Sequence, residues 1–487
     1  MAIRRQRTLK ATFAAAACVV LAACGSAVPP SKFFGAQGGL GGANNGSNGT
    51  NGSPGAFVPG ATTGAKGAKN GSGGTGGTGN TGTGGGNNGQ GNTGGQSNPG
   101  NAAAGFTIGS CAGFKNTTGI TNSTITLANV ADVSGPVPGL FAGAQQAIKA
   151  FVAYFNSASS ICGRKLALTL LDSQTSSSGD QQAATTACGS SFAMVGSMGA
   201  FDDGGAQTVQ NCGIPDLRAA ATEQARINVP NVFGTMSLNA SYIPTEPPKF
   251  YIQKFGADVT QHAAMLWLAA GAAQLNGQNE MKGFTDAGMK FVYSSGIDVT
   301  AFNYQTYVSA MKSAGVKWVE FVGAISYAVR LAQAMQQQNF TPEFILDPEF
   351  YDPSFVQSGG SAVNGVHIWA NQLPFEQVSQ SPEMQTYETW LQRTSPGAQP
   401  NYFGLYAWAA GRLFVQEALG LGGKLTRGSL IDALRGVDNY TGNGLFGPQH
   451  VGAKITASCY GFITLQNGKW IRENSGGNYL CGSVVKV

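Results

Sequence analysis

The chain has 487 residues, and 29 of its 72 glycines fall between residues 25 and 105, which excludes a globular core in that stretch. Its formal net charge of +5 does not describe the whole chain, because seven of the basic residues precede residue 107. From there onward 22 basic residues face 24 acidic ones. The body is therefore not basic, and we expect no nucleic acid partner.

The N-terminus predicts export. Residues 1–10 carry four positive charges and residues 11–23 are almost all small or apolar, as in a signal peptide. This run is too short to cross a bilayer as a helix, and it ends in Leu-Ala-Ala-Cys at Cys24, which resembles a bacterial lipobox. We predict a lipoprotein signal peptide over residues 1–23 and acylation (palmitate) of Cys24. The protein would then lie on the outer face of the cytoplasmic membrane, attached through lipid only. The alternative is an ordinary secretory signal with a chance cysteine.

A linker is predicted next. Residues 24–105 are rich in Gly, Asn, Ser and Thr, and the first acidic residue of the chain is Asp132. Such a composition predicts a disordered tether, which would span a root-mean-square distance of roughly 50 Å. It would keep the folded body near the membrane without fixing its position.

Six cysteines remain once the signal and the lipidated residue are set aside. An even number in an exported protein predicts three disulfides. Sequence alone leaves 15 pairings open. Local proximity favours Cys188 with Cys212 and Cys459 with Cys481, which leaves Cys111 to pair with Cys162. The chain has no Cys-x-x-Cys motif, so we expect neither a redox site nor a metal site.

The body alternates predicted strands and helices. In the first series, strand patterns cover 124–131, 165–172, 192–196 and 214–217, and helix patterns cover 141–155, 180–188 and 204–212. A second series follows a proline-rich turn. It has predicted helices at 258–275, 300–314 and 326–338, and predicted strands at 290–294, 316–323, 343–347 and 366–373. Two such series predict an α/β protein with two Rossmann-like lobes and parallel sheets. Ligands of open α/β sheets bind beyond the carboxyl ends of the strands, so a cleft between the lobes is expected.

Several stretches, in this order, resemble the type I periplasmic binding proteins, the Leu/Ile/Val-binding group of receptors that serve ABC importers. The stretches are TNSTI at 121–125, VADVSGP at 130–136, GRKL at 163–166, FAMVGS at 192–197, CGIP at 212–215 and FGP at 446–448. The resemblance covers about residues 120–487 and extends to the closing helix at 425–434 and a hairpin at 460–470.

The resemblance implies a solute-binding receptor whose lobes close on a small molecule and then dock to the permease subunits of an ABC importer. The family's chain crosses between lobes three times, which implies lobe 1 at residues 106–253 and 372–450 and lobe 2 at 254–371 and 451–487. We expect a monomer whose ligand is an amino acid, an amide or a related compound.

The resemblance also implies where lobe 1 contacts the ligand. Amino-acid binders hold the ligand carboxylate with hydroxyl and N–H groups after the fourth and fifth strands, where this chain has Ser197 and Thr222. Ser134, in the turn after the first strand, is a further candidate. Asp202 and Asp203 depart from the pattern, because like charges repel and would penalise a carboxylate ligand. The alternative is that both cap a helix starting at 204 and face solvent.

In lobe 2, Glu349 occupies the position where amino-acid binders hold the ligand ammonium group. It would either contact the ligand or remain a solvated loop acid. Further candidates at strand ends are Tyr293, Ser326, Tyr327 and Tyr351, although buried core tyrosines are at least as common. Phe141 and Phe201 either stack on the ligand or pack in the core, which is the commoner role.

No catalytic residue is predicted. The three histidines show no metal-ligand spacing, and neither Gly-x-Ser-x-Gly nor a Walker phosphate loop occurs. The sequence therefore predicts a binding protein without a cofactor rather than an enzyme. Two alternatives stay open: a lipid-anchored sensor or interaction module without a transporter, and a cleft that has lost its ligand.

Overall fold

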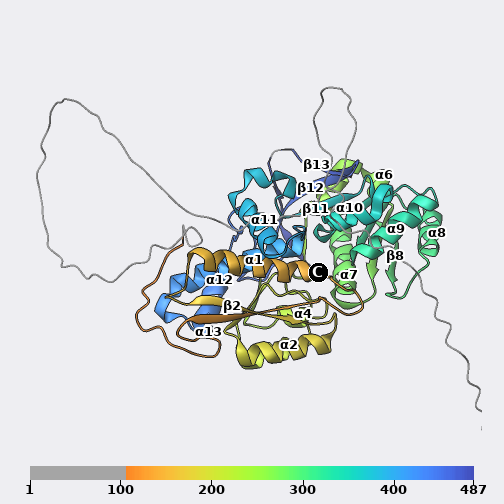
Figure 1. Ribbon diagram of the computed structural model, residues 1–487. Helices are drawn as coiled ribbons and strands as arrows, with labels where there is room; N and C mark the ends of the chain where they lie inside the picture. The colour runs from red at the N-terminus through yellow and green to blue at the C-terminus, as the bar shows by residue number, and fades with distance from the viewer. Residues whose placement is uncertain (1–105, 476) are drawn as a thin grey trace, which may run out of the picture. The chain divides into compact units, whose positions relative to one another are not determined.

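Alternating strands and helices build two separate parallel sheets in the computed structural model (Figure 1), which describes residues 106–475 and 477–487. The predicted signal peptide, Cys24 and the linker lie outside the described residues. All described residues belong to one compact unit. The α/β class with two lobes and parallel sheets, predicted from the alternation, is confirmed.

The first sheet has the strand order β2-β1-β3-β4-β5 and is parallel throughout. Its strands are β1 (Thr124–Ala131), β2 (Lys165–Asp172), β3 (Ala193–Val195), β4 (Asp216–Arg218) and β5 (Val232–Gly234). Between them run α1 (Ala142–Ala158), α2 (Ser177–Ser190), α3 (Ala206–Cys212) and α4 (Gln224–Ile227). Three later helices, α11 (Pro382–Thr394), α12 (Tyr402–Leu421) and α13 (Arg427–Arg435), return to this lobe, and Figure 1 shows α12 and α11 beside α1.

The two faces of this sheet have different cores. On one face α1 and α12 bury aromatic and aliphatic side chains against the sheet, and on the other α2 and α3 pack mainly through alanines. The helix α12 buries 14 of its 20 residues, so its apolar residues occur on all sides rather than on one stripe. Asn401 caps this helix by accepting a hydrogen bond from the Gly404 N–H.

The second sheet has the order β13-β12-β11-β10-β9-β7-β8, and β14 pairs with β12. Its parallel strands are β7 (Ala263–Leu268), β8 (Phe291–Ile297), β9 (Trp318–Val322), β10 (Glu343–Leu346) and β11 (His367–Ala370). The strands β12 (Cys459–Gln466), β13 (Lys469–Arg472) and β14 (Leu480–Cys481) join it antiparallel. A separate pair links β6 (Tyr242–Pro244) to β15 (Val484–Lys486).

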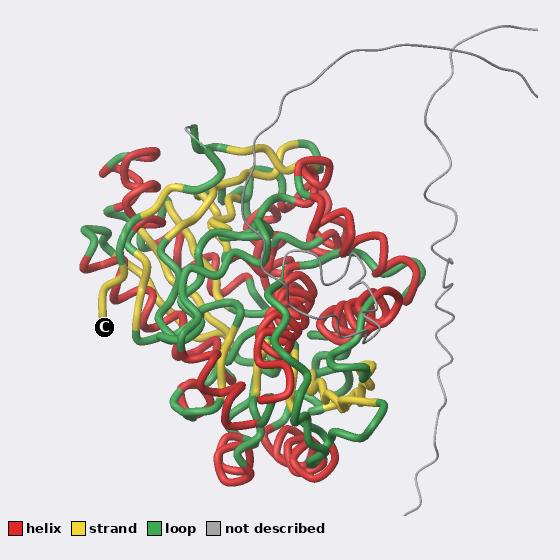
Figure 2. Tube along the Cα trace, turned by 90° about the vertical axis from the view of Figure 1, so that its left-hand side faces the viewer, coloured by secondary structure: helices red, strands yellow, loops and turns green. Residues whose placement is uncertain are grey.

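Helices cover both faces of the second sheet, and Figure 2 shows strands running between helices. One face packs α8 (Gln305–Ser313), α9 (Ile325–Gln337) and α10 (Pro353–Gly359), and the other packs α5 (Glu246–Phe255) and α7 (Gly271–Asp286). Short helices complete the lobes: α6 (Ala257–Thr260), η3 (Pro348–Phe350), η4 (Gly360–Val363), η5 (Phe375–Gln380) and η6 (Gly422–Lys424).

The helix predicted over residues 258–275 is wrong. That segment contains α6, the central strand β7 and only the start of α7. All six residues of β7, AAMLWL, are buried. A strand covered on both faces is apolar without alternation, so its sequence pattern does not separate it from a buried helix.

Three disulfides are present: Cys111–Cys162, Cys188–Cys212 and Cys459–Cys481. These are the pairs that local proximity favoured. They join residues 51, 24 and 22 positions apart, so each stabilises the fold by about 3–4 kcal/mol in the chain-entropy account. Among the helices of the described residues, none combines the length and apolarity needed to cross a bilayer.

Candidate ligand-binding site

A cleft of about 1050 Å³ lies between the two sheets. From the first lobe it is lined by residues that follow β1, β3, β4 and β5, and from the second by residues at or after the ends of β7, β9, β10 and β11. These are the carboxyl ends of the parallel strands, where ligands of open α/β sheets bind. The backbone N–H of Ala272, in α7, donates to the Ala200 carbonyl oxygen at 3.4 Å, so the two lobes also touch at the edge of the cleft.

The cleft wall is largely apolar and aromatic. Phe141 packs edge-on against Phe403 with ring centroids 4.7 Å apart, and Trp369 and Tyr460 form a similar pair at 4.9 Å. Among the described residues that line the cleft, Arg330 is the only one with a basic side chain, and it is exposed. The wall is therefore poor in countercharge for an anionic ligand.

Six of the predicted contacts line this cleft: Phe141, Phe201, Thr222, Ser326, Tyr327 and Glu349. Phe141 both packs in the core and faces the cleft, so its two proposed roles are compatible. The Tyr327 hydroxyl donates to the carbonyl oxygen of Val299 at 3.0 Å.

Four predicted contacts have other surroundings. Ser197 is fully buried, and its Oγ accepts from the Val130 N–H at 3.1 Å. The Ser134 hydroxyl donates to the carboxylate of Asp172.

The other two are tyrosines. Tyr293 lies in β8 and packs on the core beneath α8 and α9. Tyr351 is buried, donates to the carboxylate of Glu376 and accepts from the Phe375 N–H at 2.8 Å. Ser197, Ser134 and Tyr351 therefore make hydrogen bonds within the protein, and Tyr293 does not line the cleft.

The expectation that Asp202 caps a helix starting at 204 and faces solvent is wrong. The helix α3 begins at Ala206, and no side chain caps it. Asp202 is instead fully buried and accepts from the N–H groups of Thr222 at 3.0 Å and Glu223 at 2.9 Å. Arg218 lies 3.3 Å from it. Its charge is thereby neutralised inside the lobe and does not face the cleft.

Asp203 lies at the surface. It accepts from the Ser177 hydroxyl at 2.8 Å.

A buried ion network extends this arrangement. Arg218 and Arg226 both pair with Asp216, at 3.1 and 2.9 Å, and Arg226 also contacts Asp180 at 3.2 Å. Burial raises the pKa of Asp180 to about 6, against the attraction of Arg226. Removing one member would leave an uncompensated buried charge, which is strongly destabilising. The acids of this region therefore hold the lobe together.

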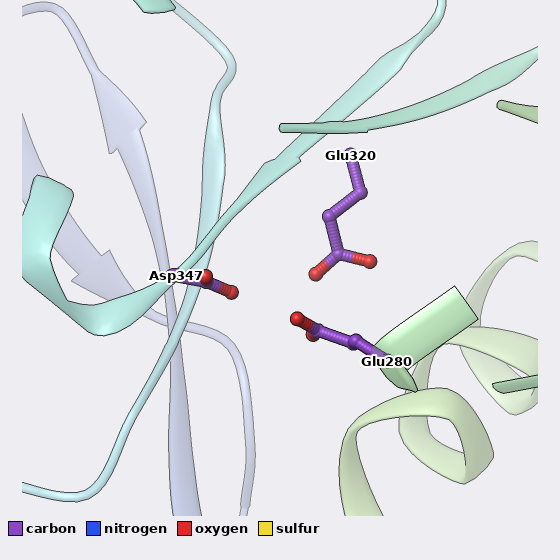
Figure 3. Close-up of side chains that lie close together, drawn as sticks. All are labelled: Glu280, Glu320 and Asp347. Carbon is purple, nitrogen blue, oxygen red and sulfur yellow. The ribbon is translucent and has the colours of Figure 1, made fainter. Parts of the chain in front are cut away.

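A second group of acids is not neutralised in this way. Glu280 from α7, Glu320 from β9 and Asp347 directly after β10 form what we call the carboxylate triad, and Figure 3 shows their carboxyl groups pointing toward one another. One oxygen from each lies within 4.8 Å of the others. Their exposed fractions are 6%, 0% and 7%, and Glu280 and Asp347 line the cleft.

The hydrogen bonding of the triad is incomplete. The Trp369 Nε1–H donates to Oε1 of Glu320 at 3.1 Å. Each triad carboxyl also has a buried oxygen that accepts from no N–H or hydroxyl group: Oε1 of Glu280, Oε2 of Glu320 and Oδ1 of Asp347. A carboxyl–carboxyl hydrogen bond joins Glu280 and Glu320 when Glu280 is protonated. Burial, followed by the neighbouring acids, raises the pKa of all three carboxyl groups well above the usual range. Burial also raises the pKa of nearby Glu349 to about 7. Such a group of oxygens suits a hard metal ion or an ammonium or guanidinium group.

Sequence reasoning missed Glu280 and Glu320. Glu280 lies in α7, which extends eleven residues beyond the end of the predicted helix at residue 275. Glu320 was available as a signal, since it is a single charge within WVEFV, a strand buried at all five positions. A buried acid in a central strand requires a partner or a function.

A model of the periplasmic binding protein family matches residues 124–469. This chain belongs to that family. The chain is a type I periplasmic binding protein, as the resemblance implied. The family consists of extracytoplasmic receptors that bind small molecules and work with the permeases of ABC transporters. No curated protein sequence matches the chain.

Three solved structures illustrate the shared fold. A leucine binding protein, LivK, from Thermotoga maritima is 14% identical, with a TM-score of 0.62 over 72% of this chain and 98% of that one. A fatty acid ABC transporter substrate-binding protein from Thermomonospora curvata is 16% identical, with a TM-score of 0.65 over 76% and 95%. An ABC transporter solute-binding protein from R. palustris, in complex with 4-hydroxybenzoate, is 16% identical, with a TM-score of 0.59 over 75% and 97%.

Proposed function

We propose that this protein is the lipid-anchored receptor of an ABC importer and captures a small molecule between two closing lobes. The cleft carries this proposal, because residues at the carboxyl ends of strands in both sheets line it. Its volume is at the upper end of the range usual for small-molecule sites, about 300–1,000 Å³. The solved structures of this fold include proteins titled for leucine, a fatty acid and 4-hydroxybenzoate.

The proposed lobes are residues 106–253 with 372–450, and residues 254–371 with 451–487. The chain passes between the sheets three times, after β5, after β11 and before β12, as three crossings require. The first crossing lies earlier than residue 253, because α5, which begins at Glu246, already packs on the second sheet. Closure would rotate the lobes about the three crossings, and α12 would move with lobe 1 because it packs on α1. The bound solute would then be withdrawn from water before the receptor reaches the permease.

The anchor and the monomeric state belong to the same proposal. Acylation of Cys24 would hold the receptor at the outer face of the cytoplasmic membrane, and the linker would allow it to reach the permease. Metabolic labelling with a palmitate analogue tests this, with Cys24→Ala as the control. Label that persists in Cys24→Ala would overturn the assignment.

Ligand capture is tested by thermal unfolding of the full chain against amino acids, amides, amines, fatty acids and aromatic acids. We expect at least one class to raise the melting temperature, because a ligand that binds only the folded state stabilises it. Uptake of that compound by cells, compared with a deletion strain, tests transport. Binding without a change in uptake would favour a sensor, and no shift with any class would overturn solute capture.

A further inference from the structure

At the first-lobe end of the cleft, the N–H groups that could hold a ligand carboxylate already bind carboxylates of the protein. The Ala200 N–H donates to Asp132 at 2.8 Å, and the Thr222 N–H donates to Asp202 at 3.0 Å. The Thr222 hydroxyl donates to the carbonyl oxygen of Gly199 at 2.6 Å. A β-carbon built at Gly199 would lie 3.6 Å from Cβ of Asp202, 3.7 Å from Nη2 of Arg218 and 3.9 Å from Oδ1 of Asp132, so acids and base are already paired here. A ligand carboxylate here would meet donors that are already used.

At the second-lobe end, the carboxylate triad offers the opposite chemistry. Its three side chains are more than nine-tenths buried, and each has an oxygen that accepts from no N–H or hydroxyl group of the protein. In the ligand-free protein Glu280 and Glu320 are paired only through a carboxyl–carboxyl hydrogen bond, which a bound cation would replace. Figure 3 shows these groups converging from three different elements, so no one local turn explains their meeting. Buried acceptors without partners are costly. A bound donor that carries positive charge would satisfy them.

The surroundings of the triad favour an organic cation over a bare metal ion. Trp369 donates to Glu320, and the Trp369 ring also lines the cleft beside Tyr460. Because Trp369 meets the triad through its N–H edge, its ring and Tyr460 would contact the apolar body of a solute whose positive group lies at the triad. The triad faces this aromatic, largely apolar cleft, whereas a calcium ion would require six to eight oxygen ligands.

We propose that the cleft binds an organic cation with an apolar body and no carboxylate, an amine or a guanidine, whose positive group lies among Glu280, Glu320 and Asp347. This inference rests on the proposed function and names its solute class. Glu349, which also lines the cleft, adds a fourth acid beside the positive group. The apolar body extends toward Phe141 and Phe201 of the first lobe.

The protonation of the triad agrees with this assignment. Burial raises the pKa of each of its three carboxyl groups, so the triad retains protons when no cation is bound. A cation replaces those protons as the partner of the carboxylates, and binding therefore releases protons to solvent.

The test compares matched probes by calorimetry on the full chain. Isopentylamine, leucine and 4-methylpentanoate share one apolar body and differ in their charged groups, as do phenethylamine, phenylalanine and 3-phenylpropanoate. Agmatine supplies a guanidinium group, and calcium chloride and magnesium chloride supply metal ions. We expect the best amine or guanidine to bind at least tenfold more tightly than any amino acid or carboxylate.

Two variants locate the positive group. Glu280→Gln and Asp347→Asn should each weaken amine binding at least tenfold. Asp286→Asn is the matched control on the same helix, where Asp286 is 54% exposed and pairs with Lys282, and it should leave binding within twofold. Unfolding curves verify that each variant is folded. An amine affinity that Glu280→Gln and Asp347→Asn leave unchanged would place the cation elsewhere and refute the inference.

Other outcomes separate this inference from the proposed function. Tighter binding of leucine or of an uncharged solute, unaffected by Glu280→Gln, would overturn the cation assignment and leave solute capture intact. Calcium binding that is lost in Glu280→Gln, without amine binding, would make the triad a metal site and also overturn it. Absence of binding by every class of solute would count against both.

Discussion

Glu320 gives a quantitative test of the carboxylate triad in the ligand-free protein. Its side chain is fully buried in the middle of β9, beside Glu280 and Asp347. Groups on the other neighbouring elements are also acidic or neutral, namely Glu349 in η3 and Tyr251 in α5. Burial and these neighbours raise the pKa of Glu320 well above the usual range. The change we consider is Glu320→Gln, which keeps the side-chain size and removes the titrating group.

The sign of the effect follows from proton binding. Above about pH 4.3 the carboxyl group of an unfolded glutamate is ionised, whereas the folded triad still holds protons because its pKa values are raised. The native state then binds more protons than the unfolded state, so the free energy of unfolding falls as pH rises through this window. Each retained proton contributes a slope of about 1.4 kcal/mol per pH unit. Between pH 5 and pH 7 one retained proton therefore accounts for at most about 2–3 kcal/mol.

Urea unfolding at pH 5, 6 and 7, followed by tryptophan fluorescence, measures this slope. The full chain contains six tryptophans. We expect wild type to lose more stability than Glu320→Gln between pH 5 and pH 7, by at most about 2–3 kcal/mol, with similar m-values. Asp286→Asn should follow wild type. Parallel profiles of wild type and Glu320→Gln would refute the retained proton.

Three further predictions concern ligand binding and the lobes. Amine binding should tighten as pH rises from 6 to 8 and should release protons. Calorimetry in buffers of different ionisation enthalpy measures this release. Uptake of protons on binding would contradict the raised pKa values of the triad. Asp202→Asn should lower the free energy of unfolding by about 3 kcal/mol, because Arg218 loses a buried partner. The variant should keep the preference for amine over leucine. A changed preference would show that Asp202 contributes to ligand binding. Replacing both Cys188 and Cys212 by Ala should cost about 3 kcal/mol in chemical unfolding, as expected for a closed loop of 24 residues, and an unchanged midpoint would show that this disulfide does not constrain the unfolded chain.

The fold was largely predictable because the strand and helix periods are clear in most of this body. The predicted strands at 124–131 and 165–172 have the same bounds as β1 and β2. The pattern failed at β7, where burial on both faces removes alternation, and the failure hid the start of α7. A false helix at that place also removed Glu280 from consideration. A wrong secondary-structure prediction therefore also produces a wrong prediction of the site, because we predict cleft residues from their position after a strand.

The candidate site was less predictable for a different reason. Ser197 and Thr222 occupy the expected loops, but the hydrogen-bond partners of these loops come from Asp132 and Asp202. Sequence can place a hydroxyl or an N–H beside a cleft, yet it does not show which acceptor is already bound there. Glu320 is visible in the sequence as a single charge in an apolar strand, but its neighbours in the triad come from elements 40 and 27 residues away in the chain, and their proximity is not visible there.

The structure still argues against an amino-acid ligand, but for a different physical reason than the one expected from the sequence. Repulsion by Asp202 and Asp203 does not support it, because Asp202 is paired with Arg218 inside the lobe and Asp203 is exposed at the surface. What disfavours a ligand carboxylate is that Asp202 and Asp132 accept the N–H groups it would need. This difference has a consequence for mutation. If repulsion acted alone, Asp202→Asn would admit leucine, but because an Asn side chain still accepts from the Thr222 N–H, exclusion should persist in the variant.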